Sequence, residues 1–373
     1  MEPLIPPFDP VNFDLPFTIP ILNQDIISMF GILVAAGLLY GAKVAMQKAE
    51  NDGLDPDILN RFVTWVVVGI FVGGHVGHVL MYESELLETE GLVTLLKFNK
   101  GLSSFGGFFA CVMLSMWYFR KEGKRINEEN RSRHAAGQSL LAPMKPWAYA
   151  DAALKGFVPG YCIGRLGCFS VKDHPGQITD LPLGVRGMCT WDWNDELSRP
   201  GGRPTCADEV MSAENQERLA HLIPESTAGM TEYDLFQLMN PETALHDLGF
   251  YEALWFLALT PIFFYLDRKP RFPGFFAALL VFTHMPMRVF LDTMRLEVGI
   301  DRWYFSTESF KGLTPAQMGS IAFMGLGVWI VMKRRHIEPV RITVQRLREE
   351  EAAKGILPPP EDDDSGDAGA STG

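Results

Sequence analysis

Apolar residues along this chain gather in seven blocks that are separated by polar segments. The blocks span residues 24–43, 62–82, 101–119, 147–169, 248–266, 273–291 and 316–332. Each block is about 17–23 residues long, which is enough for an α-helix to cross the ~30 Å of hydrocarbon in a bilayer. The pattern therefore predicts an all-α polytopic membrane protein with about seven transmembrane helices.

The distribution of basic residues predicts how these helices are oriented. Lys and Arg are frequent in "FRKEGKRINEENRSRHAAGQSLLAPMKPW", "DRKPRF" and "KRRH", which follow blocks three, five and seven. Because cytoplasmic loops are enriched in Lys and Arg, we expect a periplasmic N-terminus and a cytoplasmic C-terminus. Residues 1–335 then form the transmembrane domain, with a periplasmic head loop at 170–247 between helices 4 and 5.

The predicted cytoplasmic tail covers residues 336–373. Its first part, "VRITVQRLREEEAAKG", predicts a short helix, and its end, "PPPEDDDSGDAGASTG", has the low hydrophobicity and high charge of a disordered segment.

Overall composition changes this picture little. The hydrophobic share of 47% is ordinary, and the net charge of −12 lies mainly in the head loop and the tail. This charge says little about partners, and no nucleic-acid partner is expected. Two of the five cysteines, Cys189 and Cys206, lie in the head loop. A disulfide and a pair of buried thiols are both open interpretations for them.

Polar residues inside three of the apolar blocks indicate a functional site, because charges in a membrane are costly. In block six, His284, Arg288 and Asp292 are four residues apart and Arg295 follows, so they share one helix face. Arg165 ends block four at a similar predicted depth. Two guanidinium groups at the outer boundary of the bilayer could bind the phosphate of a lipid headgroup. The alternative is that each arginine reaches into the interface or pairs with an acid such as Asp292.

In block two, His75 and His78 are three residues apart and share a face of the predicted helix. A metal site built from the histidines is disfavoured, because no carboxylate–histidine spacing supports it.

The segment around Arg165 resembles the signature of the prolipoprotein diacylglyceryl transferase family, G-R-x-G-N-F-x-N-x-E-x-x-G. The matching positions are Gly164, Arg165, Gly167, Phe169, Asp173 and Gly176, with Asp in place of Glu and with Cys168 in place of Asn. The resemblance implies a seven-helix fold in the bacterial inner membrane. It also implies transfer of the diacylglyceryl group of phosphatidylglycerol to the lipobox cysteine of a preprolipoprotein.

Other segments follow the family pattern in the same order. "HDLGFYEALW" is similar to H-P-x-x-L-Y-E and keeps His246, Tyr251 and Glu252. "MRVFLDTMR" is similar to R-x-x-x-E-x-x-R and keeps Arg288, Asp292 and Arg295. "FVGGHVGHVLMY" resembles the glycine-rich second span of the family, although an arginine and a tyrosine usually stand at His75 and His78.

One departure affects the chemistry that the resemblance implies. The histidine that is proposed to serve catalysis in the family is Phe105 here. A substitute is therefore expected among His75, His78, His246 and His284, and we favour His284, which shares a helix face with Arg288.

The expected site then combines catalytic and substrate-binding residues. The catalytic residues are Arg165, Arg288 and His284. The substrate-binding residues are Arg165, Gly164, Gly167, Cys168, Asp173, Gly176, His75, His78, His246, Tyr251, Glu252, Asp292 and Arg295. No metal or cofactor is expected, and the expected partners are phosphatidylglycerol, preprolipoprotein signal peptides and the bilayer. Because of Phe105, two alternatives stay open: a related membrane enzyme that acts on another acceptor, and a phospholipid-binding homologue without catalysis.

The predicted orientation can be tested with reporter tags. Tags after Arg335 and within residues 121–143 should report the cytoplasm, and tags within residues 196–224 should report the periplasm, because of the distribution of Lys and Arg. A periplasmic signal from residues 121–143 would contradict the orientation of the whole chain.

Overall fold

The computed structural model describes residues 4–10, 12–19, 24–82, 91–96, 104–189, 206–224, 230–296 and 312–356. The chain divides into two compact units. Unit 1 comprises Met1–Gly41, Gly156–Tyr265 and Ala277–Ile330, and unit 2 comprises Ala42–Lys155, Leu266–Phe276 and Val331–Gly373.

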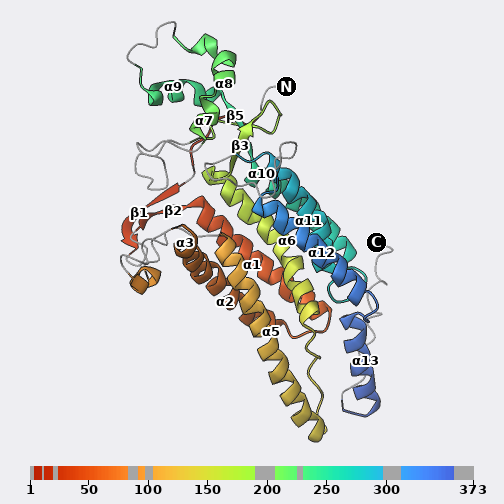
Figure 1. The fold of residues 1–373 in the computed structure, drawn as a ribbon. Helices are drawn as coiled ribbons and strands as arrows, with labels where there is room; N and C mark the ends of the chain where they lie inside the picture. The colour runs from red at the N-terminus through yellow and green to blue at the C-terminus, as the bar shows by residue number, and fades with distance from the viewer. Residues whose placement is uncertain are drawn as a thin grey trace, which may run out of the picture. The chain divides into compact units, whose positions relative to one another are not determined.

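Long helices account for most of the described chain (Figure 1). They are α1 (Met29–Asn51), α2 (Pro56–Val68), which continues through the π-helix η1 (Gly69–Gly73) into α3 (Gly74–Tyr82), α5 (Ser104–Ala135), α6 (Pro146–Val171), α10 (Leu248–Leu266), α11 (Phe275–Thr293) and α12 (Pro315–Arg334). Within the described part of the chain, five segments are long and apolar enough to cross a membrane: Met29–Asn51, Pro56–Leu80, Leu248–Leu266, Phe275–Thr293 and Ala316–Arg334. The chain is therefore a mostly helical, polytopic membrane protein.

Three details differ from the sequence-based expectation. The chain is not all-α, because it contains five short strands among the described residues. The first block begins as strand β2 (Gln24–Ser28), which pairs with β1 (Asn12–Ile19), so the helix starts only at Met29. The third helix, α5, runs on through the basic segment to Ala135, because that segment contains no proline and only one glycine, Gly123.

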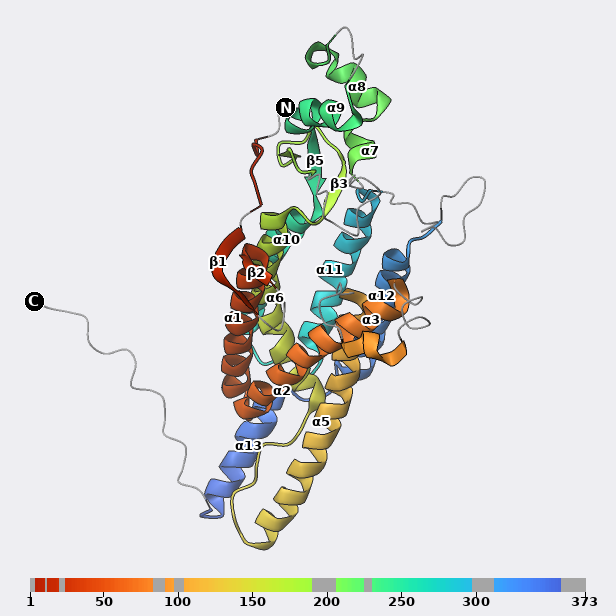
Figure 2. The ribbon, with the colours of Figure 1, turned by 90° about the vertical axis from the view of Figure 1, so that its left-hand side faces the viewer.

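The head of unit 1 is a small sheet with its own core. Strand β5 (Ala244–Asp247) lies between β3 (Pro175–Ile178) and β4 (Val185–Arg186), and both pairings are antiparallel. Figure 2 shows the short helices α7 (Ala207–Val210), α8 (Ala213–Arg218) and α9 (Glu232–Met239) around this sheet. Cys189 and Cys206 form a disulfide, with their Cα atoms 5.9 Å apart, in the buried cluster that includes Met188, Phe236 and Leu245.

Glycines bring α1 and α6 into close contact within unit 1. A Cβ atom on Gly37 would lie 2.3 Å from the carbonyl oxygen of Gly160, and one on Gly41 would lie 2.7 Å from that of Gly156. Small residues allow this close approach. Because no hydrophobic effect drives helices together inside a bilayer, van der Waals packing between the two helices stabilises the contact instead. The contact fixes the helix that carries Arg165.

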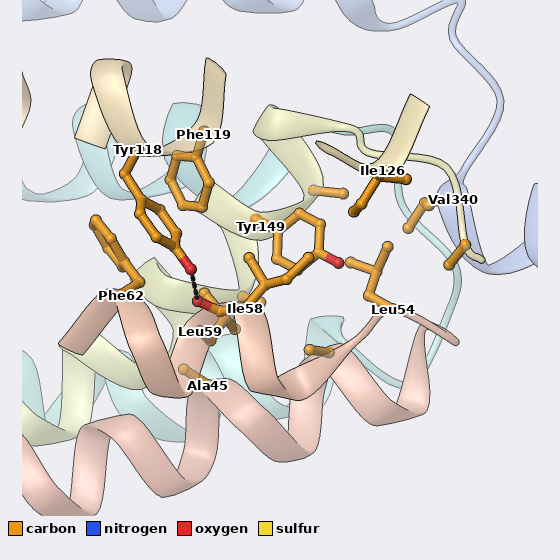
Figure 3. Close-up of a cluster of buried hydrophobic side chains, with 14 of the residues drawn as sticks. Ala45, Leu54, Ile58, Leu59, Phe62, Tyr118, Phe119, Ile126, Tyr149 and Val340 are labelled. Atoms are coloured by element: carbon orange, nitrogen blue, oxygen red, sulfur yellow. Dashed lines mark hydrogen bonds between the residues drawn. The ribbon is translucent and has the colours of Figure 1, made fainter. Parts of the chain in front are cut away.

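Unit 2 has an aromatic core that involves α1, α2, α5 and α6. Figure 3 shows Phe62, Tyr118, Phe119 and Tyr149 packed with Ile58, and the Tyr118 hydroxyl donates to the Ile58 carbonyl at 2.8 Å. Helix α13 (Val340–Ala353) adds Val340 and Val344 to this core, which confirms the helix predicted for the first part of the tail.

Buried ion pairs hold the same unit together. Lys48 lies 2.5 Å from Asp52 and 2.6 Å from Asp267, and Lys155 lies 2.5 Å from the other oxygen of Asp267. All four side chains are nearly inaccessible to solvent. Arg341 of α13 contacts Asp52 at 2.9 Å, so the tail helix is anchored by charge as well as by apolar packing.

The glycine contact between α1 and α6 predicts a stability difference between two glycine variants. Gly160→Ala should lower the stability of the purified full-length protein by about 1–3 kcal/mol, because the new Cβ would lie 2.5 Å from the Gly37 carbonyl oxygen. Gly325→Ala is the matched control, because its Cβ would meet no atom within 4 Å. Thermal unfolding in detergent measures both, and equal melting temperatures would contradict the packing role.

Candidate functional site

A reversal of the chain after α6 forms one side of the site. The helix ends at Val171, and Lys172 adopts a left-handed backbone with φ of 57°. A left-handed residue at this position turns the chain away from the helix axis. The Lys172 ammonium donates to the Gly187 carbonyl at 2.7 Å and lies over the Phe8 ring. The reversal brings His174 back to Arg165, whose Nη1 lies 3.2 Å from His174 Nε2.

The centre of the site is the buried carboxylate of Glu252. Its Oε2 lies 2.5 Å from Arg165 Nη2, and its Oε1 accepts from Arg288 Nη1 at 2.9 Å. The Tyr161 hydroxyl donates to Glu252 at 3.2 Å and accepts from Arg165 Nε at 2.9 Å. One carboxylate thus joins α6, α10 and α11. With two guanidinium groups and one carboxylate, this cluster carries a net charge of +1.

The two arginines differ in how many of their N–H donors already have partners in the described part of the protein. The donors of Arg165 are directed at Tyr161, Cys168, His174 and Glu252. Glu252 is the one partner of Arg288 among the described residues, and that contact uses Nη1. No described residue contacts the Nε and Nη2 donors of Arg288, and its side chain is the more exposed of the two, at 24% against 13%. This unused edge has the geometry that binds an oxyanion through two parallel hydrogen bonds.

A second group of polar side chains lies next to Arg165. Atoms of Cys168, Asp173 and His174 lie within 4.8 Å of one another, and His174 Nδ1 pairs with the Asp173 carboxylate. Burial lowers the pKa of His174, but the hydrogen bonds to Asp173 and Cys168 outweigh this effect and raise the pKa to about 9. These three residue types could ligate a metal ion. The fit is poor, because the Arg165 guanidinium contacts both Cys168 and His174 and would repel a cation there.

His284 lies on the side of the cluster that faces the apolar residues. Its ring packs against Phe256 at 4.8 Å and against Tyr161 at 6.5 Å between centroids. Its Nδ1 is buried without a hydrogen-bond partner in the described part of the chain. His284 is thus close to the arginine cluster, as predicted, and its catalytic role stays a prediction.

Other expected residues of the head and of α11 lie at the edge of this arrangement. His246 Nδ1 lies 2.9 Å from the Tyr251 hydroxyl, and burial lowers the pKa of His246. Asp292 accepts from the Thr314 hydroxyl, so the acid that pairs with both arginines is Glu252 and not Asp292. Arg295 lies beyond Thr293, the last residue of α11, so the prediction that it shares a helix face with His284 and Arg288 is wrong. It forms an isolated antiparallel bridge with Gly176.

Two of the three expected glycines have packing explanations. A Cβ on Gly167 would meet the backbone of Phe30 in α1 at 3.2 Å, and a Cβ on Gly176 would lie 2.6 Å from the Met294 carbonyl oxygen. The absence of side chains at these two positions allows close contact with α1 and with the end of α11. A Cβ on Gly164 would make only ordinary contact with Val34 of α1, at 4.0 Å. A role in lipid binding stays a prediction for all three glycines.

His75 and His78 lie on α3 in unit 2 and are both buried. The residues that the structure gathers around Glu252 all belong to unit 1. The side chain of Phe105, at the start of α5, lies outside the described residues. A substrate-binding role for the two histidines stays a prediction.

Sequence analysis missed two residues of the site. Tyr161 precedes Arg165 by four residues, one helical turn, and this spacing could have indicated their contact. His174 follows Asp173 directly, but only the left-handed residue Lys172 turns it back towards Arg165. Glu252 was expected as a substrate-binding residue, and no sequence signal indicated that it would hold both arginines.

The fold and this cluster define a polytopic membrane protein with a positively charged site at the ends of three helices. The chain belongs to the prolipoprotein diacylglyceryl transferase family, whose family model matches residues 16–333.

Curated relatives support this assignment at low identity. The chain is 23% identical over 331 residues to the phosphatidylglycerol–prolipoprotein diacylglyceryl transferase of Porphyromonas gingivalis, covering 87% of this chain and 93% of the relative. It is 32% identical over 184 residues to the enzyme of that name from Solidesulfovibrio magneticus, covering 48% of this chain and 58% of the relative. The match to the Thermus thermophilus enzyme is 27% over 169 residues, covering 45% and 52%.

The position of Glu252 predicts a large effect of an isosteric substitution. Glu252→Gln should lower the stability of the protein by about 3–5 kcal/mol, because two guanidinium groups would face each other without a counter-ion. Glu242→Gln is the matched control, since Glu242 also pairs with an arginine, Arg186, but is half exposed. The control should cost less than ~1 kcal/mol. Equal melting temperatures for the two variants would contradict a central structural role for Glu252.

Proposed function

We propose that this protein transfers the diacylglyceryl group of phosphatidylglycerol to the lipobox cysteine thiol of preprolipoproteins. The observation that carries the proposal is the Arg165–Glu252–Arg288 cluster with its net charge of +1. A phosphodiester carries a single negative charge, which balances this site. The family match supports the same substrates, since the relatives are named for phosphatidylglycerol and prolipoprotein.

The chemistry requires stabilisation of charge on the phosphate. The acceptor sulfur forms a bond to the diacylglyceryl carbon, and the bond from that carbon to the phosphate oxygen breaks. The electron pair stays on the phosphate, which becomes a glycerol phosphate with an additional ionisable oxygen. Arginine donors that are already held in place stabilise such developing charge without reorganisation. Glu252 holds both arginines, so they need not be ordered by the substrate.

We infer that Arg288 makes the main direct contact with the phosphate. Its Nε and Nη2 donors are unused among the described residues, whereas the donors of Arg165 already have protein partners. Arg165 then attracts the phosphate by its charge. It can also give up its contacts with Cys168 and His174 in exchange for contacts with the phosphate. The reaction needs no metal or organic cofactor.

The proposed setting is the bacterial inner membrane, with seven spans, a periplasmic N-terminus and a cytoplasmic C-terminus. Together with the five candidate spans, α5 and α6 complete the proposed seven. The charged residues Asp151, Lys155 and Arg165 lie within α6. Residues 170–247 are the proposed periplasmic head, and residues 336–373 are the proposed cytoplasmic tail. In this orientation the Glu252 cluster meets lipid headgroups and the acceptor signal peptide at the periplasmic surface.

Substitutions of Arg288 test the function. In phosphatidylglycerol vesicles with a lipobox peptide, Arg288→Ala should lower kcat/KM at least ~30-fold, the effect of losing about 2 kcal/mol from a charged contact. Arg288→Lys should be intermediate, because an ammonium keeps the charge but not the planar fork. The control is Arg335→Ala, an exposed arginine that contacts the neighbouring His336.

Three experimental outcomes distinguish the proposed function from its alternatives. Lipid transfer to the peptide, and rescue of a bacterium depleted of its own transferase, support the proposal. Phosphatidylglycerol turnover without a modified peptide would favour a different acceptor. Lipid binding without turnover by the wild-type protein would contradict an enzyme.

A further inference from the structure

His174 lies beside Arg165, and both of its ring nitrogens have partners in the protein. Guanidinium groups have donors only, so Arg165 Nη1 donates to His174 Nε2 at 3.2 Å. The lone pair of the neutral ring is therefore on Nε2 and the proton is on Nδ1. That proton is donated to the Asp173 carboxylate. An acid that orients an imidazole in this way is the arrangement that prepares a general base.

The thiol of Cys168 belongs to the same group of side chains. Cys168 Sγ lies 3.4 Å from Arg165 Nη1 and within 4.8 Å of the ligand atoms of Asp173 and His174. The His174 carbonyl also accepts from the Leu248 backbone N–H at 3.1 Å, so the residue is held at the start of α10, the helix that carries Glu252. The imidazole and the two arginines are thus positioned by the same elements.

Resting on the proposed function, we propose that His174 is the general base for the acceptor thiol and that Asp173 is its positioning residue. When Arg165 Nη1 gives up its contact with His174 Nε2 and turns to the phosphate, this nitrogen takes the proton from the thiol. The resulting thiolate attacks the diacylglyceryl carbon. As the carbon–oxygen bond breaks, its electron pair remains on the phosphate oxygen. The imidazolium then returns the same proton to that phosphate, which leaves as a singly charged glycerol phosphate, so no proton or charge is left over.

The protonation equilibrium of His174 matches this task. Burial lowers its pKa, and the contacts with Asp173 and Cys168 raise it to about 9, close to the ~8.5 of an ordinary thiol. Proton transfer between the two groups is then nearly balanced. The charged groups that face His174 are Asp173, Arg165, Asp247 of β5 and Glu252 of α10. Burial raises the pKa of Asp247 only to about 6, so it stays ionised across the alkaline range.

The sign of the pH dependence follows from these contacts. The base acts when it is deprotonated, so transfer at saturating substrate should rise with pH up to about pH 9. Ionisation of the acceptor thiol alone would give a similar rise. Asp173→Asn separates the two causes, because it removes the carboxylate that raises the pKa of His174 and leaves the peptide thiol unchanged. The rise should therefore move to lower pH in this variant only if His174 is the base.

The experiment compares full-length variants in phosphatidylglycerol vesicles with a lipobox peptide between pH 6 and pH 10. His174→Gln should lower kcat by about 100- to 10,000-fold. It should retain stabilisation by phosphatidylglycerol in thermal unfolding, which shows that the protein is folded. His221→Gln is the matched control, since His221 is an exposed histidine of the same head. His284→Gln tests the alternative base and should keep the wild-type pH profile.

Each outcome decides between the two levels of the proposal. A wild-type protein that transfers no lipid at any pH would overturn both the function and the role of His174. An active wild type with an unchanged rate in His174→Gln, or an unchanged pH profile in Asp173→Asn, would overturn only the role of His174. Loss of the pH-dependent rise in His284→Gln, with His174→Gln still active, would assign the base to His284.

Discussion

The site depends on one buried carboxylate that carries two guanidinium groups. Glu252 is 1% exposed, and Arg165 and Arg288 approach it from α6 and α11, while it belongs to α10 itself. Without this counter-ion, the mutual repulsion of the arginines and the cost of desolvating them would oppose the packing of the three helices. Because two positive charges share one negative charge, the assembled site still attracts an anion. Helix packing and ligand affinity therefore come from the same interaction.

Arg165 connects this charge cluster to the residues that can move a proton. On one side it contacts Glu252 and Tyr161, and on the other it contacts Cys168 and His174. The left-handed conformation of Lys172 makes this second side possible, since the chain must reverse for His174 to reach the arginine. The glycines that let α1 and α6 touch fix the helix from which Arg165 extends. A site of this kind is built by backbone geometry as much as by the choice of charged residues.

Two of the three departures from the family signature lie beside His174. Cys168 stands where the family has asparagine, Asp173 stands where it has glutamate, and Phe105 stands where it has the histidine proposed for catalysis. The first two lie beside His174, which pairs with Asp173. The chain is only 23% identical to a relative over most of that relative's length, so differences at individual site positions are expected. The two arginines and Glu252, which lie in the segments that resemble the family, are in contact with one another. The chain is thus a family member in which Glu252 holds the two arginines together, while residues around His174 depart from the signature.

The sequence by itself determined the helices and the two arginines, because apolar blocks of membrane length and charges within them are local signals. It also indicated the tail helix, confirmed as α13, and both cysteines of the disulfide, although not their pairing. Spacing along one helix could not show that Glu252 of α10 pairs with Arg165 and Arg288, since that contact joins residues 87 and 36 positions away. Nor could it place His174 beside Arg165, because a positive φ at Lys172, a non-glycine residue, has no signature in composition or periodicity. Charge partners and chain reversals depend on tertiary packing. A buried charged group pairs with the opposite charge that the packing of the neighbouring helices places next to it.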